Sequence, residues 1–376
     1  MKKIVFITGT RADYGKIKSL LYRVENSERF EAYIYVSGMH LLEIFGNTYK
    51  EILKDKYRNI HIAYGLANTR ITSYDLGNVI CDFTGYVKNI KPDMIVVHGD
   101  RVDALAGAIV GALNNICVAH IEGGELSGTI DESIRHAISK FAHLHFVANE
   151  EAKKHLIQLG EDVEHIFVIG SPDIDIMISK SLPNIELARQ RYDMNFVQYG
   201  ILMYHPVTTE YKNLNENIHK VTNALLRTKE NIIVIYPNND LGYEIILNEY
   251  RRFDGNNRFK MYPSVRFEYF LTFLKNAKFI IGNSSAGIRE AAVYGLPAID
   301  IGNRQEGRYN IDILRNIQHV NEDEKEIIFA LDRVEKYRYI SKTYGEGDSA
   351  DSFMTILEDE KIWGIELQKR FYEVNW

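Results

Sequence analysis

Short apolar runs alternate along the chain with longer segments in which apolar residues recur every three to four positions. The runs are typical of buried parallel strands, and the longer segments are typical of amphipathic helices. We predict strands at residues 4–7, 32–36, 94–97, 117–121, 145–148, 165–169, 200–203, 231–236, 278–281 and 298–301. This alternation predicts βαβ units and parallel sheets with helices on both faces.

The alternation pauses around residues 181–184, and we place a domain boundary near residue 180. A chain of 376 residues exceeds what one hydrophobic core usually organises. We therefore predict an α/β protein with two doubly wound, Rossmann-like domains at 1–180 and 181–355. We expect an amphipathic helix at 356–376 to pack back across the boundary. Ligands of such sheets bind beyond the carboxyl ends of the strands, so we expect the domains to face each other across a cleft.

Composition narrows the class of partner. Hydrophobic residues make up 45% and charged residues 26%, as in a soluble globular protein, and the net charge of −6 offers no basic surface for nucleic acid. No run approaches the ~18 apolar residues of a membrane span, and the first run is too short for a signal peptide. Cys81 and Cys117 lie among apolar residues without a zinc or redox spacing, which fits a reducing cytoplasm.

The first predicted strand ends in a glycine-threonine turn that leads into a helix. Backbone N–H groups and the helix dipole at such a position suit an anion, and Arg11 and Lys16 add positive charge. The turn does not match the G-x-G-x-x-G pattern. A plain connection and a phosphate contact remain equally open for this loop.

Acidic residues follow two successive predicted strands. Asp100 comes after the strand at 94–97, and Glu122 comes after the strand at 117–121. Pairing with Arg101 and capping of the next helix are alternative explanations of Asp100. The loop after Glu122 is rich in glycine, which lets a backbone approach a ligand closely. Acids at two neighbouring strand ends favour a functional site over a solvated loop.

Asp131 follows this glycine-rich loop. Thr129 and Glu132 fit a capping box that begins a helix, and Asp131 is either a first-turn acid favoured by the helix dipole or a proton-transfer group. Both interpretations remain open on local sequence. The spacing of His136, His143 and His145 matches no ligand pattern, and we predict no metal there.

The second half carries a candidate nucleotide site. His205 follows the strand at 200–203, where an imidazole suits contact with a pyrophosphate or proton transfer. Residues 278–301 predict a strand, loop, helix, turn and strand, with paired serines and a glycine amide at the helix N-terminus, where a diphosphate binds well. An acid in the first helical turn suits ribose hydroxyls. The residues assigned to this site are Ser284, Ser285, Gly287, Glu290 and Arg304.

Six motifs together resemble the hydrolysing UDP-N-acetylglucosamine 2-epimerases of sialic acid synthesis. They are GTRAD at 9–13, HGDR at 98–101, HIEGGELSGTID at 120–131, HPVTT at 205–209, PNND at 237–240 and GNSSAGIRE at 282–290. The resemblance spans nearly the whole chain, and the motif at 120–131 is the most specific. Relatives that epimerise without hydrolysis carry Arg-Pro-Glu after the first glycine-threonine and a His-Arg-Arg-Glu motif in the second domain. This chain has Arg-Ala-Asp at 11–13 and His-Pro-Val at 205–207, which indicates the hydrolysing branch.

The resemblance implies a GT-B-like fold, a cytoplasmic enzyme, a UDP-sugar substrate, a homo-oligomer, and no metal or other cofactor. It places the catalytic residues at Asp100, Glu122, Asp131 and His205. It places the substrate-binding residues at Arg11, Arg101, Asn239, Ser284, Ser285, Gly287, Glu290 and Arg304.

The implied reaction is anti elimination of UDP to give 2-acetamidoglucal, followed by hydration to N-acetylmannosamine. It needs a general base and a general acid, which carboxylates in different environments supply. Three alternatives are the same reaction on UDP-2,4-diacetamido-2,4,6-trideoxyglucose, a GT-B glycosyltransferase, and a non-catalytic nucleotide-sugar sensor. The cluster of acids disfavours the last two.

Overall fold

The structure is a computed structural model that describes residues 1–376 except 67–70, 128–129, 180–181, 371 and 374–376. The chain divides into two compact units. Unit 1 comprises Met1–Glu125, Asp131–Ile178 and Tyr344–Trp376, and unit 2 comprises Leu126–Ile130 and Ser179–Thr343. The chain therefore returns to unit 1 at Tyr344, whereas the sequence analysis assigned residues up to 355 to the second domain.

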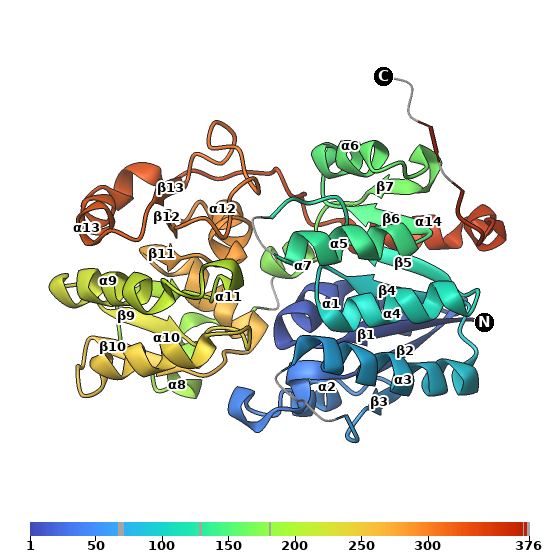
Figure 1. The fold of residues 1–376 in the computed structure, drawn as a ribbon, viewed down its shortest axis with the longest axis horizontal. Helices are drawn as coiled ribbons and strands as arrows, with labels where there is room; N and C mark the ends of the chain where they lie inside the picture. The colour runs from blue at the N-terminus through green and yellow to red at the C-terminus, as the bar shows by residue number, and fades with distance from the viewer. Residues whose placement is uncertain (67–70, 128–129, 180–181, 371, 374–376) are drawn as a thin grey trace. The chain divides into compact units, whose positions relative to one another are not determined.

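Unit 1 contains a seven-stranded parallel sheet in the order β3-β2-β1-β4-β5-β6-β7 (Figure 1). Its strands are β1 (Lys2–Thr8), β2 (Phe30–Val36), β3 (Ile60–Ile62), β4 (Met94–His98), β5 (Cys117–Ile121), β6 (Leu144–Val147) and β7 (Ile166–Val168). The winding direction reverses between β1 and β4. Ligands of doubly wound sheets bind at such a reversal, beside the loops that follow the strands.

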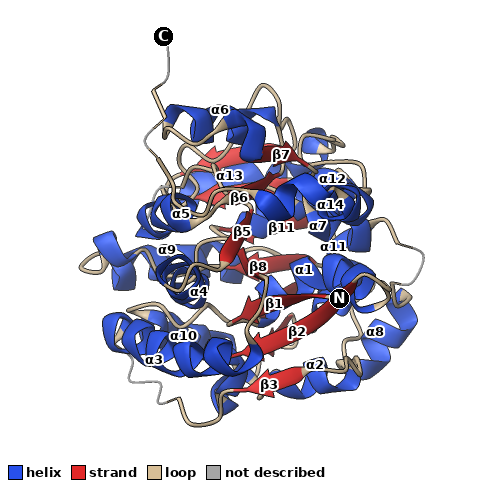
Figure 2. Cartoon of the chain, turned by 90° about the vertical axis from the view of Figure 1, so that its right-hand side faces the viewer, coloured by secondary structure: helices blue, strands red, loops and turns tan. Residues whose placement is uncertain are grey.

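Helices cover both faces of this sheet (Figure 2). Ile4 and Phe6 of β1 pack on the side of α1 and α14, while Val5 and Ile7 pack on the side of α3 and α4, because successive side chains of a strand point to opposite faces. The helices are α1 (Arg11–Glu25), α2 (Tyr49–Lys54), α3 (Thr72–Ile90), α4 (Val102–Leu113), α5 (Ile130–Phe141), α6 (Glu150–Gln158), α7 (Pro172–Met177) and α14 (Ser349–Glu358).

Unit 2 contains a six-stranded parallel sheet in the order β10-β9-β8-β11-β12-β13, with its reversal between β8 and β11. The strands are β8 (Gly200–Met203), β9 (Ile232–Ile235), β10 (Phe259–Tyr262), β11 (Phe279–Gly282), β12 (Ala298–Ile301) and β13 (Ile317–Val320). The helices are α8 (Ile185–Arg191), α9 (Leu214–Arg227), α10 (Tyr243–Tyr250), α11 (Phe267–Lys275), α12 (Glu290–Tyr294) and α13 (Glu324–Asp332). Two doubly wound α/β units confirm the predicted fold class.

Two local expectations are wrong. The helix expected at 356–376 ends at Glu358, because a separate 3-10 turn follows at Glu360–Gly364. Beyond that turn the chain is held to unit 1 by Lys369, whose ammonium donates to the carbonyls of Ser139 and Ala142. Cys81 is exposed on α3, not surrounded by apolar groups. None of the helices in the described ranges is both long and apolar enough to cross a membrane.

The segment that returns to unit 1 should contribute to stability through the packing of α14. Phe353 of α14 is fully buried and packs edge-on against Phe146, with ring centroids 4.8 Å apart. Phe353→Ala should lower the free energy of unfolding by about 3 to 5 kcal/mol, because it removes buried apolar surface and leaves a cavity. Phe329→Ala, at a 60% exposed position, is the matched control and should change it by less than about 0.5 kcal/mol in urea titrations. Equal effects would contradict this packing.

Candidate active site

The loop after β1 supplies its own anion. The carboxylate of Asp13 accepts hydrogen bonds from the N–H groups of Gly9 and Thr10, and Thr10 completes a capping box with Asp13 at the start of α1. Arg11 Nη2 donates to Glu51 Oε1 at 2.7 Å. Of the two interpretations left open for this loop, the geometry therefore favours a structural turn, with the predicted phosphate contact Arg11 held in an ion pair.

The loop after β4 carries Asp100 and is fixed by a buried histidine. Burial lowers the pKa of His120 to about 3, so its imidazole is neutral. His120 Nε2 lies 2.8 Å from the Gly99 carbonyl oxygen and must carry the proton, so Nδ1 accepts from Ser139 Oγ at 3.1 Å. The sequence analysis missed this role for His120, although the residue stands inside the motif at 120–131.

Glu122 follows β5 in an unusual backbone conformation. Its φ of 65° is in the left-handed region, which costs a non-glycine residue about 1 to 3 kcal/mol and is concentrated at functional sites. Its Oε1 lies 3.4 Å from Lys16 Nζ, 3.4 Å from Ser171 Oγ and 3.5 Å from His98 Nε2. Lys16 Nζ also lies 3.7 Å from the buried Asp173 carboxylate. Glu122 thus shares one buried ammonium with a second acid.

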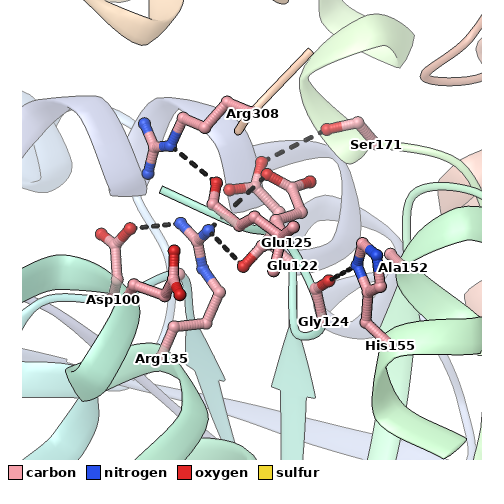
Figure 3. A network of polar contacts seen from close by, with 12 residues as sticks. Asp100, Glu122, Gly124, Glu125, Arg135, Ala152, His155, Ser171 and Arg308 are labelled. Carbon is pink, nitrogen blue, oxygen red and sulfur yellow. Dashed lines mark hydrogen bonds and ion pairs between the residues drawn. The ribbon is translucent and has the colours of Figure 1, made fainter. Parts of the chain in front are cut away.

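The glycine-rich loop is packed against α6. A Cβ at Gly124, which has a φ of +76°, would lie 2.2 Å from the Ala152 carbonyl oxygen, so no other residue fits. His155 Nδ1 donates to the Gly124 carbonyl at 2.7 Å (Figure 3). The glycine at 124 therefore serves close packing within unit 1, whereas the sequence analysis associated the glycines with approach to a ligand.

Arg135 of α5 joins the loop after β4 to the loop after β5. It is 2% exposed, forms an ion pair with Asp100, and donates from Nη1 to the Glu125 carbonyl at 3.1 Å (Figure 3). Asp131 is buried one turn earlier on the same face of α5. One partner of Asp100 therefore comes from α5, and Arg101 occupies the N-cap position of α4.

Two further predictions concern residues in or near α5. The capping box expected from Thr129 and Glu132 includes Thr129, which lies outside the described residues. His143 Nδ1 accepts from the Val118 N–H, and His145 Nε2 lies 3.1 Å from Glu161 Oε2. Across the described ranges, no cluster of three His, Cys, Asp or Glu side chains has a metal-binding arrangement.

In unit 2, a buried asparagine holds together the loops at the reversal of the sheet. The Asn283 side chain accepts from the His205 N–H at 2.6 Å and donates to the His205 carbonyl at 2.9 Å. The backbone carbonyl of Asn283 accepts from Arg304 Nη1 at 3.2 Å and from Gln305 Nε2 at 2.8 Å. Asn283 thus links the predicted residues His205 and Arg304, and the sequence analysis did not single it out.

The tautomer of His205 is set by the backbone. His205 Nδ1 accepts from the Asn238 N–H at 3.0 Å, so a neutral imidazole carries its proton on Nε2. The predicted residue Asn239 follows in the same loop and is half-buried. A neutral His205 can therefore only donate from Nε2, which suits an anionic oxygen.

The predicted phosphate loop differs in detail from a single helix N-terminus. Ser285–Gly287 forms a 3-10 turn capped by Ser284, whose Oγ accepts from the Ala286 N–H at 3.3 Å, and α12 starts only at Glu290. Glu290 is 4% exposed, and Arg304 is buried as well.

A separate contact within unit 2 involves Arg308, whose Nε donates to the Leu126 carbonyl at 3.0 Å (Figure 3).

Comparison with known proteins identifies the family. A family model described as UDP-N-acetylglucosamine 2-epimerase matches residues 22–358. The chain belongs to this family. This epimerase is 44% identical, over 100% of both chains, to the UDP-N-acetylglucosamine 2-epimerase of Neisseria meningitidis serogroup B.

One further relative and one solved structure support the family and the fold. A Legionella pneumophila protein named UDP-N,N'-diacetylbacillosamine 2-epimerase (hydrolyzing) is 35% identical over 95% of this chain and 96% of its own. The crystal structure of a Neisseria meningitidis UDP-GlcNAc 2-epimerase bound to UDP-GlcNAc has a TM-score of 0.81 at 17% identity, covering 94% of this chain and 99% of the other. The epimerase thus shares the GT-B-like fold of two Rossmann-like domains.

A buried acid of the epimerase predicts a pH effect on stability. Burial raises the pKa of Asp103 from 3.8 to about 6, although Ser37 donates to it. Because the folded pKa is raised, the protonated acid favours folding, and this contribution is lost as the pH rises through about 6. Between pH 5 and pH 7.5, the free energy of unfolding of the parent should fall by about 1 kcal/mol relative to Asp103→Asn in urea titrations. A constant difference between the two proteins would contradict the raised pKa.

Proposed function

We propose that the chain is a hydrolysing UDP-N-acetylglucosamine 2-epimerase that converts UDP-N-acetylglucosamine and water into N-acetylmannosamine and UDP. The observation that carries this proposal is the pair of acids at the ends of neighbouring strands with different charge partners. Asp100 is paired with Arg135, and Glu122 shares Lys16 with Asp173. Acids in different environments suit opposite proton-transfer roles.

The chemistry requires such a pair. A base removes the C2 proton, and the electrons of the C2–H bond form the C1=C2 double bond of 2-acetamidoglucal. The C1–O bond breaks at the same time, and UDP leaves with the electrons of that bond. Water then adds at C1 and gives up one proton to a base, while an acid delivers a proton to C2 from the opposite face. We propose that Asp100, Glu122 and Asp131 share these transfers.

The nucleotide is proposed to bind unit 2. His205 donates from Nε2 when neutral, and the hydroxyls of Ser284 and Ser285 lie at the turn after β11, within which the Gly287 N–H donates to the Ser284 carbonyl at 3.0 Å. Such donors stabilise the negative charge that develops on a leaving diphosphate. Arg11, Arg101, Asn239, Glu290 and Arg304 remain proposed substrate contacts. The cytoplasmic location and the homo-oligomer also remain predictions.

The hydrolysing branch and the sugar are inferred. Residues 11–13 and 205–207 lack the patterns of the non-hydrolysing relatives, and the Legionella relative carries the word hydrolyzing in its name. That relative also favours a second candidate, the same reaction on UDP-2,4-diacetamido-2,4,6-trideoxyglucose. The higher identity to the Neisseria protein supports UDP-N-acetylglucosamine first.

Product analysis tests the proposal. The purified protein, given each UDP-sugar separately without an acceptor, should release UDP and free N-acetylmannosamine from UDP-N-acetylglucosamine, identified by NMR. EDTA should leave the rate unchanged, because protein donors are expected to neutralise the diphosphate. Formation of UDP-N-acetylmannosamine alone would indicate the non-hydrolysing reaction, and turnover of only the diacetamido sugar would establish the second candidate.

The three acids should act in chemistry and not in nucleotide binding. Asp100→Asn, Glu122→Gln and Asp131→Asn should each lower kcat by about 10²-fold or more, because they keep the shape but remove the transferable proton. The affinity for UDP, measured by calorimetry, should stay within about threefold of the parent. An acid needed only for hydration should, when replaced, let 2-acetamidoglucal accumulate. Unchanged kcat in all three variants would contradict the assignment.

The turn after β11 should act in nucleotide binding. Ser285→Ala and Glu290→Ala should each weaken UDP binding by about 1 to 3 kcal/mol, since each removes a hydrogen bond to the nucleotide. Glu216→Ala, at an exposed position on α9, is the matched control and should leave the affinity unchanged. Parental affinity in both test variants would show that the diphosphate binds elsewhere.

A further inference from the structure

Arg135 stands out because it is a buried cation with no role in the reaction proposed above. Its side chain is 3% exposed, and the partner carboxylate of Asp100 is 16% exposed. The same guanidinium donates to the Glu125 carbonyl and lies 4.0 Å from Glu125 Oε2. An arginine placed in this way restrains both the charge and the direction of Asp100.

The charge environment of Asp100 differs from that of Glu122. Asp100 has a guanidinium as an ion-pair partner, and an adjacent positive charge stabilises the ionised form of a carboxylate. Glu122 shares the single ammonium of Lys16 with the buried Asp173 at comparable distances of 3.4 and 3.7 Å, whereas Arg135 is hydrogen-bonded to Asp100 and lies 4.0 Å from Glu125 Oε2. Of the two acids, Asp100 is therefore the better candidate for a base.

We propose that Arg135 is a positioning residue that holds Asp100 ionised and correctly oriented, so that Asp100 removes the C2 proton of the sugar. This inference rests on the proposed function. The C2–H electrons form the C1=C2 double bond, the proton passes to Asp100, and UDP leaves with the electrons of the C1–O bond. Arg135 acts through Asp100 and contributes no proton.

The pH profile of the reaction must distinguish the titration of Asp100 from that of other groups near it. His120 is neutral over the tested range of about pH 5 to pH 9, since burial lowers its pKa to about 3. Asp103 faces Gly9 and Gly38, and burial raises its pKa to about 6, so it titrates within that range. The pH profile of Asp103→Asn therefore has to be recorded beside the others. Further charged or titratable groups on the neighbouring elements include His98, Arg101, Glu122, Glu125, Asp131, Glu132, His136 and Lys140.

The test compares Arg135→Gln with Arg135→Lys. For each variant, kcat/KM for UDP release from UDP-N-acetylglucosamine is measured from about pH 5 to pH 9. In Arg135→Gln, the acidic limb of the profile should move to higher pH by about 1 to 3 units, because the ionised Asp100 loses its cation. Arg135→Lys keeps the charge, and its limb should move by less than about 1 unit. Arg58→Gln, which removes an exposed arginine paired with Glu25, is the control and should leave the limb in place.

A double variant keeps the proposal testable if Arg135→Gln folds poorly. Asp100→Asn combined with Arg135→Gln removes both charges of the Asp100–Arg135 pair, and its kcat should fall no more than about threefold below that of Asp100→Asn alone. An unmoved limb in Arg135→Gln, or a further loss of tenfold or more in the double variant, would overturn the role of Arg135. An inactive parent enzyme with normal UDP binding would instead refute the proposed function.

Discussion

The candidate site depends on one constraint, which is that every strand of the unit 1 sheet is parallel to its neighbours. The carboxyl ends of all these strands therefore lie on the same side of the sheet. Residues that follow different strands meet there although they are far apart in sequence. Lys16, His98 and Ser171 come from three separate βα segments and lie within 3.5 Å of Oε1 of Glu122, which comes from a fourth. The same constraint in unit 2 brings His205, Asn238 and Asn283 together after β8, β9 and β11.

Such a concentration of charge has a cost in stability, and the fold offsets it by pairing. A buried carboxylate without a partner would be strongly unfavourable, but Asp100 is paired with Arg135, and Glu122 with Lys16. The left-handed backbone of Glu122 adds a strain of about 1 to 3 kcal/mol. Helices α1 and α14 cover one face of the sheet, and α3 and α4 cover the other. The hydrophobic burial in these two layers offsets the unfavourable free energy of the site.

The sequence was sufficient for the interior strands of both sheets and for the edge strand β7, but not for the other three edge strands. The predicted strands are all present, because buried parallel strands are apolar on both faces. The strands β3, β10 and β13 were missed, since each lies at the edge of a sheet, is short and mixes polar with apolar residues. The terminal helix was predicted too long because amphipathic spacing continues past Glu358, where the backbone changes to a 3-10 turn.

The positions of the predicted acids followed from strand ends, but their partners did not. Arg135 is 35 residues from Asp100, and His120 is 21 residues from Gly99, so only the folded sheet shows these contacts. One signal was available for Arg135, namely its i,i+4 spacing from Asp131 on an amphipathic helix. For Asn283, a polar residue between a strand and a serine pair gave no local indication that its side chain would bind the His205 backbone.

The most direct test of the central claim, that carboxylates transfer protons at C2 during elimination and hydration, is the reaction in D₂O. N-acetylmannosamine formed by the parent enzyme should carry solvent deuterium at C2 in its NMR spectrum, because the original proton is removed on one face and a new one arrives on the other. Product that carries only the original C2 hydrogen, with internal return of the abstracted proton excluded, would contradict the account.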